Sequence, residues 1–250
     1  MTTTLITGAS SGLGAEMARQ LAARGNDLAL CARRTERLAE LREEILTDYP
    51  ERRVSVAALD VTDDDAVFAV FAGFRAEFGT LDRVIINAGL GKGAPIGKGR
   101  YDANKATAMT NFVAALAQSE AAMEIFRDQH YGHLVMVSSM SAFRGMPGAM
   151  TTYAATKAAV AALAEGIRHE LVGKPALDID VSVLYPGYIR SEMNEHVKST
   201  PFMVDTVTGV AAMVAAIEKR SAHARVPAWP WVPMGTAMRH LPLPRVRRLT

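Results

Sequence analysis

Short apolar segments alternate with segments of helical spacing along almost the whole chain. Strands are expected at the N-terminus, before a glycine turn, and at about residues 27–32, 53–59, 83–87, 133–138, 178–186 and 224–228. Helices are expected from the glycine turn to Gly25, at about 35–48, from a capping-box pair of Thr62 and Asp65 to Gly79, and at about 102–128, 153–172 and 205–220. Strict alternation of strand and helix implies a doubly wound parallel sheet of about seven strands with helices on both faces. Ligands bind such a sheet beyond the carboxyl ends of its strands, where the strand order reverses.

Length and composition favour one large α/β domain: the chain has 250 residues, of which 49% are hydrophobic, and no internal repeat. We expect this domain to span residues 1–228, followed by a Pro/Arg-rich tail at 229–250. The only cysteine, Cys31, excludes an intramolecular disulfide. The N-terminal residues lack the basic and apolar regions of a signal peptide, and no apolar run is long enough to span a membrane. These features predict a cytoplasmic protein.

Charge is unevenly distributed, because no acidic residue follows Glu218 and the residues after it carry seven of the positive charges. The net charge of +2 therefore leaves about −5 on residues 1–218. Tryptophan and arginine in the tail suit a peripheral membrane contact, but the prolines there prevent one continuous amphipathic helix. We favour a tail that packs on its own or a neighbouring subunit. The basic run is too short to predict nucleic-acid binding.

The turn after the first strand reads TGASSGLG and carries Gly8, Gly12 and Gly14. A tight turn here needs residues without a Cβ, and it lets a pyrophosphate approach the backbone. The helix that follows points its free N–H groups and the positive end of its dipole at such a phosphate. The glycines and the turn residues between them are therefore predicted to bind a dinucleotide, namely Gly8, Ser10, Ser11, Gly12, Leu13 and Gly14. The alternative is a tight strand-to-helix turn with no ligand.

The end of the second strand indicates which dinucleotide binds. An acidic residue there would bind the adenosine ribose of NAD, whereas this chain has Arg33 and Arg34. Guanidinium groups suit a 2′-phosphate through charge-assisted hydrogen bonds, so we expect NADP(H). The alternative is a solvated pair of arginines at the start of a helix.

Four motifs together resemble the single-domain branch of the short-chain dehydrogenase/reductase family. They are TGASSGLG, the Asn87-Ala88-Gly89 triplet, Tyr153-x₃-Lys157 and Pro186-Gly187, in the family's order and over the chain to about residue 190. The resemblance implies a Rossmann-like fold, a nicotinamide cofactor, and hydride transfer between that cofactor and a small-molecule carbonyl or alcohol. It also implies a homodimer or homotetramer, which the alanine-rich helices at 102–128 and 153–172 would allow by close packing.

The resemblance also assigns further cofactor contacts. Asp60 and Val61 would bracket the adenine, and Asn87, Ala88 and Gly89 would line the nucleotide cleft. The nicotinamide end would meet the segment after the sixth strand, at Pro186, Gly187, Ile189 and Ser191. For Asp60 and Asn87 the alternative is that each satisfies backbone groups at a strand end.

Tyr153 and Lys157 are four residues apart and share one face of a helix. A nearby ammonium lowers the pKa of a phenol, as a general acid/base at a carbonyl requires, so both are predicted to act in catalysis and to contact the cofactor. The family usually has a substrate-binding serine 13 residues before the tyrosine, whereas Ser139 lies 14 before Tyr153. Ser139 is our choice, and two neighbouring serines, Ser138 and Ser141, remain alternatives.

Asn111, in the long helix, matches the family's asparagine that holds a water in the proton relay. The alternative is a polar residue on a helix that pairs subunits. No metal site is predicted, because the six histidines show no ligand spacing and one cysteine cannot build a site.

Substrate selection is expected from residues 188–205 and the 90–100 loop. The mixture of Met, Phe and Val with charge at residues 192–205 suggests a lipophilic substrate under a mobile lid. Two other functions share part of the pattern. A nucleotide-sugar epimerase or dehydratase uses the same Tyr-x₃-Lys pair but is usually longer. A non-catalytic NADPH sensor or scaffold commonly lacks the tyrosine or the lysine.

Overall fold

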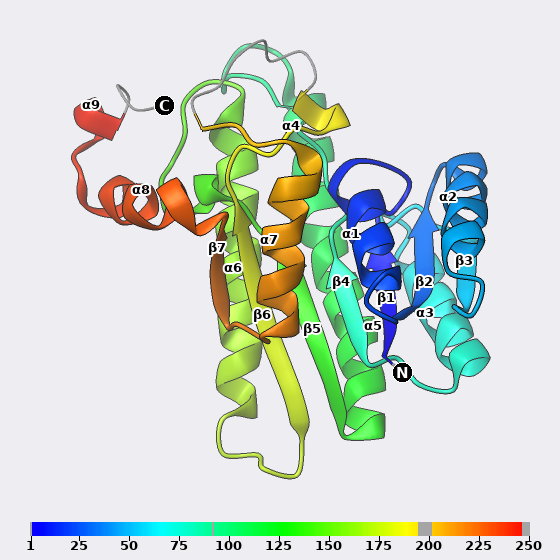
Figure 1. Cartoon of the computed structure of the whole chain (residues 1–250). Helices are drawn as coiled ribbons and strands as arrows, with labels where there is room; N and C mark the ends of the chain where they lie inside the picture. Colours follow the sequence, from blue (N-terminus) through cyan, green and yellow to red (C-terminus); the bar gives the residue numbers. More distant parts are fainter. Residues whose placement is uncertain (1, 92, 195–201, 247–250) are drawn as a thin grey trace.

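A single parallel sheet of seven strands crosses the computed structural model, which describes residues 2–91, 93–194 and 202–246. The strand order is β3-β2-β1-β4-β5-β6-β7 (Figure 1). The strands are β1 (Thr3–Thr7), β2 (Asp27–Ala32), β3 (Val54–Ala58), β4 (Arg83–Ile86), β5 (Tyr131–Val137), β6 (Asp178–Pro186) and β7 (His223–Val226). The predicted Rossmann-like, doubly wound α/β fold is confirmed.

Helices cover both faces of the sheet (Figure 1). One face carries α1 (Gly12–Ala22), α2 (Thr35–Asp48) and α7 (Thr206–Glu218), whose apolar side chains share one core cluster. The other carries α3 (Asp64–Phe78), α5 (Ala114–Gln129) and α6 (Met150–Leu171), which share the second cluster. Because both faces of the sheet are covered, β1, β2 and β4 are buried along their whole length.

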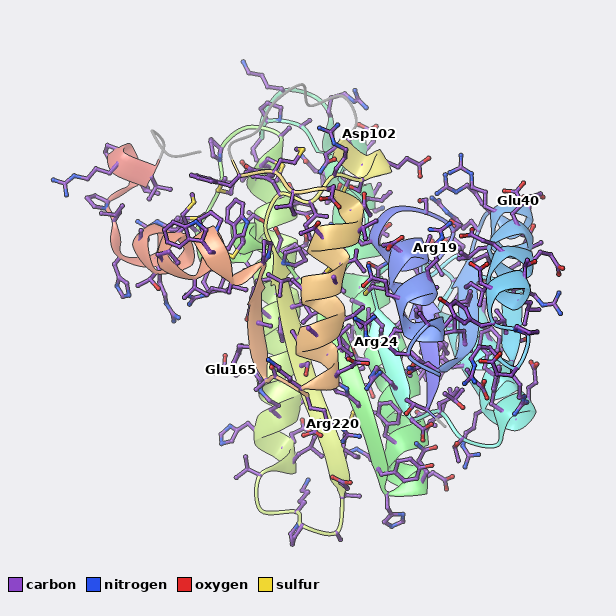
Figure 2. The ribbon with its side chains drawn as sticks, viewed as in Figure 1. Arg19, Arg24, Glu40, Asp102, Glu165 and Arg220 are labelled. Atoms are coloured by element: carbon purple, nitrogen blue, oxygen red, sulfur yellow. The ribbon has the colours of Figure 1, made fainter. Side chains whose placement is uncertain are left out.

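Ion pairs at the surface join α1 to its neighbours. Arg19 binds Glu44 of α2 at 2.7 Å, and Arg24 binds Glu218 of α7 at 3.3 Å. Figure 2 labels both arginines, of which Arg19 lies on α1 and Arg24 in the turn that follows it. Exposed pairs of this kind contribute about 0.2–1 kcal/mol each, so the buried core dominates the stability of this layer.

The strand order reverses between β1 and β4. Thr4 of β1 pairs with Leu28 of β2 on one side and with Arg83 of β4 on the other. From β1 the chain continues through β2 to β3 at one edge, whereas β4 begins the series that ends with β7 at the other. Parallel α/β sheets bind ligands at the carboxyl ends of the strands around such a reversal, so the crevice is expected beside the loops that leave β1 and β4.

The long helix expected at 102–128 is interrupted. It consists of α4 (Tyr101–Ala108), a π-helical turn η1 (Met109–Val113) and α5, and Ala114 N–H donates to the Met109 carbonyl five residues before it. Turns of this type inside α-helices occur frequently at functional sites. Asn111 lies at the centre of this turn.

The predicted Thr62–Asp65 capping box is wrong. Asp63 caps α3 instead, and its carboxylate accepts from Ala66 N–H at 3.0 Å. The Thr62 hydroxyl donates to Asp60 at 2.8 Å, so it serves the end of β3 and not the helix.

The residues after β7 form α8 (Ala228–His240) and α9 (Leu243–Val246). Trp229 is not helical, so Pro230 is the first helical residue, where a missing N–H leaves no hydrogen bond unmade, whereas Pro233 lies inside the helix. Trp231 belongs to the main core cluster, so this segment packs on the domain. Within the described part of the chain, no helix is long and apolar enough to cross a membrane.

Candidate active site

The glycine turn between β1 and α1 is close-packed against the end of β4. Gly8 has φ +65°, and a Cβ there would lie 2.9 Å from the Ala88 Cα. A Cβ on Gly14 would collide with the Gly8 carbonyl and come within 2.7 Å of the Asn87 Nδ2. Ser11, at the N-cap of α1, makes no side-chain capping bond, so the first turn of the helix has no acceptor from it. This arrangement fits a pyrophosphate.

Asn87 and Ala88 join the ends of β1 and β4. The Thr7 hydroxyl accepts from the backbone N–H of Asn87 at 3.1 Å and of Ala88 at 3.2 Å. The Asn87 Nδ2 donates to the carbonyls of Thr7 at 3.0 Å and Gly8 at 3.3 Å. Asn87 thus satisfies backbone groups at the strand ends, which is the alternative that the sequence left open, and it thereby positions the glycine turn.

Arg33 and Arg34 leave the end of β2 in different environments. Arg33 is two-thirds exposed and lies 3.9 Å from the Asp60 carboxylate. Arg34 folds over the glycine turn, where its Nε donates to the Ser10 hydroxyl at 3.3 Å and its Nη2 to the Ser11 hydroxyl at 2.6 Å. The two guanidinium groups therefore lie beyond the end of β2, beside the end of β3 and the glycine turn.

Asp60 closes the end of β3. Its carboxylate accepts from the Thr62 backbone N–H at 3.0 Å, and this bond lowers its pKa. Val61, the next residue, is buried in the core cluster between the sheet and α3. Asp60 thus satisfies local donors while its remaining surface faces Arg33.

Tyr153 and Lys157 lie on α6, next to the end of β5. The Lys157 ammonium is buried, donates to the Val137 carbonyl at 2.8 Å, and lies 5.8 Å from the centre of the Tyr153 ring. Burial lowers the pKa of Lys157 to about 8. It also raises the pKa of Tyr153, against the opposing effect of a hydrogen bond with Ser139. The expected lowering of the Tyr153 pKa is therefore not observed in this structure, because desolvation of the phenol outweighs its favourable contacts.

The three candidate serines after β5 have different partners. The Ser138 hydroxyl donates to the Lys157 carbonyl at 2.7 Å, which uses it to anchor α6. The Ser141 hydroxyl is buried and has no hydrogen-bond partner among the described residues. Ser139, the N-cap of the 3₁₀ turn η2 (Met140–Phe143), is the serine whose hydroxyl lies near enough to the Tyr153 phenol to lower its pKa. The structure therefore brings Ser139, and not its neighbours, to the tyrosine.

Asn111 is fully buried beneath this cluster. Its Oδ1 accepts from Leu90 N–H at 2.7 Å and its Nδ2 donates to the Leu90 carbonyl at 2.9 Å, so it holds the loop after β4. A Cβ on Gly89 would lie 3.3 Å from the Asn111 Oδ1 and 3.7 Å from the Lys157 Nζ. Because Gly89 has no side chain, the narrow space between it, the Asn111 amide and the Lys157 ammonium stays unfilled.

The segment after β6 covers the crevice. Gly187 N–H donates to the Val226 carbonyl at 2.9 Å, which continues the pairing from Pro186. Ile189 is buried against Gly209 of α7. Ser191 lies next to Gly12, and its Cβ is 3.5 Å from the position that a Cβ added to Gly12 would take. The predicted lid extends to residue 205, but residues 195–201 lie outside the described residues.

Three further residues belong to this site although the motifs do not include them. Glu192, in the turn η3 (Glu192–Asn194), binds Arg34 and also Arg37 of α2. Trp231 of α8 packs its indole over the face of Gly187, where a Cβ would clash with the ring, and its N–H has no partner. Arg37 could have been predicted from the sequence, because it is the third arginine of ARRTER at the end of the second strand. Glu192 and Trp231 could not, because only the fold brings them to the crevice.

Among the described residues, no group of three or more His, Cys, Asp or Glu side chains is arranged to hold a metal ion. Cys31, the free thiol, is buried in the core, and burial raises its pKa.

Comparison with known proteins places these features in one family. Residues 2–201 match the family model described as short chain dehydrogenase. An uncharacterized oxidoreductase of Mycobacterium tuberculosis is 54% identical over 98% of this chain and 95% of its own length. The 11-beta-hydroxysteroid dehydrogenase 1A of Arabidopsis thaliana is 32% identical over 90% of this chain and 68% of its own length.

Solved structures agree on the fold. A short-chain dehydrogenase from Sphingobium yanoikuyae in complex with NADPH has a TM-score of 0.83 and 27% identity, covering 99% of this chain and 94% of that one. A member from Burkholderia phymatum in complex with NAD has a TM-score of 0.85 at 19% identity, with coverage of 99% and 94%. The neighbours thus include complexes with either dinucleotide.

Proposed function

Since this oxidoreductase belongs to the short-chain dehydrogenase/reductase family, we propose that it uses NADP(H) to interconvert a carbonyl and an alcohol, with Tyr153 as the acid/base. The observation that carries the proposal is the meeting of Ser139, Tyr153 and Lys157 beside the end of β5. A half-buried phenol near a serine hydroxyl and an ammonium is the donor set that proton transfer to a carbonyl oxygen needs.

The residues at the ends of β1, β2 and β4 would hold the cofactor. The turn from Gly8 to Gly14 would take the pyrophosphate, and Arg33 and Arg34 favour the 2′-phosphate of NADP(H) because no acidic residue replaces them at the end of β2. The NADPH complex of the Sphingobium yanoikuyae relative supports this choice by analogy. When bound, the nicotinamide supplies the hydride for reduction or accepts it in oxidation.

The side chains at the other end of the crevice handle the substrate oxygen. In the reducing direction the Ser139 hydroxyl donates a hydrogen bond to that oxygen, and the Tyr153 hydroxyl gives it a proton as negative charge develops. The Lys157 ammonium stabilises the phenolate left behind and holds the nicotinamide ribose. By the family resemblance, Asn111 retains a water that returns the proton to this relay. A preorganised set of donors at the developing charge supplies a large part of such a rate enhancement.

A lipophilic substrate is supported by the residues around the opening. Tyr188, Met193 and Phe202, which lie within the segment 188–205, are exposed apolar side chains, and Met193 lies against Gly91 of the 90–100 loop. The indole of Trp231 forms a further wall and contacts the Tyr188 ring edge-on at 5.4 Å. The name of the Arabidopsis thaliana relative, a hydroxysteroid dehydrogenase, agrees with an apolar substrate.

The proposal extends to assembly and location. Met109, Val113 and Leu116 leave apolar surface exposed along η1 and α5, which suits a homodimer or homotetramer. A single buried thiol at Cys31 suits the cytoplasm.

Titration of the purified protein with NADPH and with NADH, followed by nicotinamide fluorescence, tests the cofactor assignment. We expect tighter binding of NADPH, and loss of that preference in Arg33→Asp. Arg239→Asp on α8 makes the same charge change away from the end of β2 and should retain the preference. Equal affinity for NADH would refute the assignment, and the absence of NADPH turnover with a panel of lipophilic ketones and alcohols would refute the proposed reaction.

A further inference from the structure

A carboxylate from the far side of the crevice already occupies the Arg34 guanidinium. The Glu192 Oε1 accepts from the Arg34 Nη1 at 2.8 Å, and its Oε2 accepts from the Arg34 Nη2 at 2.9 Å. This is the bidentate arrangement in which guanidinium groups also bind phosphates. Arg37 adds a third bond to the Glu192 Oε1 at 3.3 Å. One internal anion thus engages two of the three arginines at the adenosine end.

Both edges of the Arg34 guanidinium that include Nη2 have hydrogen-bond partners. On one edge, its Nε donates to the Ser10 hydroxyl and its Nη2 donates to the Ser11 hydroxyl, and both of these partners are neutral. The last edge, formed by Nη1 and Nη2, is bound to the Glu192 carboxylate. A phosphate and a carboxylate cannot both take that last edge, because two anions in one place repel each other. Arg33, by contrast, is two-thirds exposed, and within the described part of the chain its ion-pair partner is the Asp60 carboxylate at 3.9 Å.

The backbone around Glu192 is held in place by its own hydrogen bonds. Asn194 accepts from Ser191 N–H at 2.9 Å and donates to the Ile189 carbonyl at 2.8 Å, so the turn is closed on both sides of Glu192. Ile189 anchors this turn in the core. Arg34 lowers the pKa of Glu192 to about 2, so the carboxylate is ionised throughout the physiological pH range.

We propose that Glu192 is a specificity-determining residue of the cofactor site: it occupies the edge of Arg34 that the 2′-phosphate of NADP(H) would take, and NADP(H) must displace it. NADH carries no phosphate there and binds without this competition. Glu192 therefore sets the preference for NADP(H) below the value that Arg33 and Arg34 alone would produce. The inference rests on the proposed function, because it assumes that the dinucleotide lies across the glycine turn.

The test is Glu192→Gln, which keeps the size of the side chain and removes its charge. NADPH and NADH would be titrated into the cofactor-free protein, together with the fragments 2′,5′-ADP and 5′-AMP, which differ only in the 2′-phosphate. Exposed ion pairs of this type correspond to affinity changes of up to about fivefold. We expect NADPH and 2′,5′-ADP to bind about three- to fivefold more tightly to the variant, with NADH and 5′-AMP unchanged within about twofold.

Glu36→Gln is the matched control, because Glu36 lies in the first turn of α2 and has the Thr35 hydroxyl as its hydrogen-bond partner. It removes the same charge near the same site without releasing Arg34. If both variants tighten NADPH binding equally, the effect is one of net charge and the proposal is overturned. Weaker or unchanged NADPH binding in Glu192→Gln also overturns it, since the carboxylate would then support the bound state.

The outcomes separate this proposal from the proposed function. If the natural protein binds NADH as well as NADPH but Glu192→Gln prefers NADPH, the cofactor assignment is wrong and the role of Glu192 stands. If the natural protein prefers NADPH and Glu192→Gln does not increase that preference, only the role of Glu192 is wrong. If neither protein binds any of the four compounds, both proposals fail.

Discussion

The Thr7 hydroxyl supports the crevice from below, and its removal should be costly. It is fully buried and accepts from two backbone N–H groups, those of Asn87 at 3.1 Å and Ala88 at 3.2 Å. Thr7→Val keeps the shape of the side chain but leaves both donors without this acceptor. Each of the two donors is only part-buried, so leaving it unsatisfied costs about 1.5–2 kcal/mol, and the added methyl group offsets about 1 kcal/mol. We therefore expect the free energy of unfolding to fall by about 2–3 kcal/mol.

Urea unfolding measures this change, and thermal unfolding should show a fall of about 4–12 °C in Tm for a chain of this size. Because the same hydrogen bonds align the glycine turn with the end of β4, the Kd for NADPH should rise as well. Thr47→Val is the matched control, since the Thr47 hydroxyl is exposed and donates to the Glu43 carbonyl within α2. It should change stability by less than about 0.5 kcal/mol. A Thr7→Val variant as stable as this control would refute the reasoning.

Three further predictions follow from the buried ionisable groups. Tyr153→Phe should lower kcat by about 10²–10⁴-fold while the Kd for NADPH stays within about threefold, because only the proton donor is lost. Steady-state kinetics measure kcat and fluorescence titration measures the Kd. Near-normal turnover would exclude Tyr153 as the acid. Burial lowers the pKa of Lys157 to about 8 from an ordinary 10.5, so between these values the unfolded chain binds more protons and stability from this group rises with pH. Between pH 7.5 and 9.5 the free energy of unfolding of the natural protein should therefore rise by about 2 kcal/mol more than that of Lys157→Met, as measured by urea titration at each pH. Parallel pH profiles of the two proteins would contradict this. His133 is fully buried between Arg83 and Ser182, and burial lowers its pKa to about 3 from 6.5, so stability is lost as the pH falls from 6.5 toward 3. His133→Gln should reduce the loss of unfolding free energy between pH 6.5 and 4.5 by about 2–3 kcal/mol. An unchanged acid profile would show that His133 does not cause this loss.

Local sequence patterns were sufficient for the fold. The strands at 27–32 and 178–186 and the helix at 35–48 have the expected bounds, because burial on both faces and helical spacing are written into consecutive residues. The i, i+4 spacing likewise placed Tyr153 and Lys157 on one helix face, since that relation needs only α6 itself. The capping residue of α3 was misassigned because Thr62, Asp63 and Asp65 all suit a helix start, and the hydrogen bond from Thr62 to Asp60 decides between them.

Contacts between distant segments and the burial of individual groups were decided by the tertiary structure. Ser138, Ser139 and Ser141 are equivalent in the sequence, and only the packing of η2 against α6 brings Ser139 to Tyr153. The direction of the Tyr153 pKa shift depends on desolvation by neighbours far along the chain, which no spacing rule contains. Glu192 and Arg34 are separated by more than 150 residues, and Trp231 reaches Gly187 from a segment expected to be a tail. Hydrophobic periodicity acts over a few residues, whereas each of these contacts requires the whole sheet to bring strand ends together at one edge.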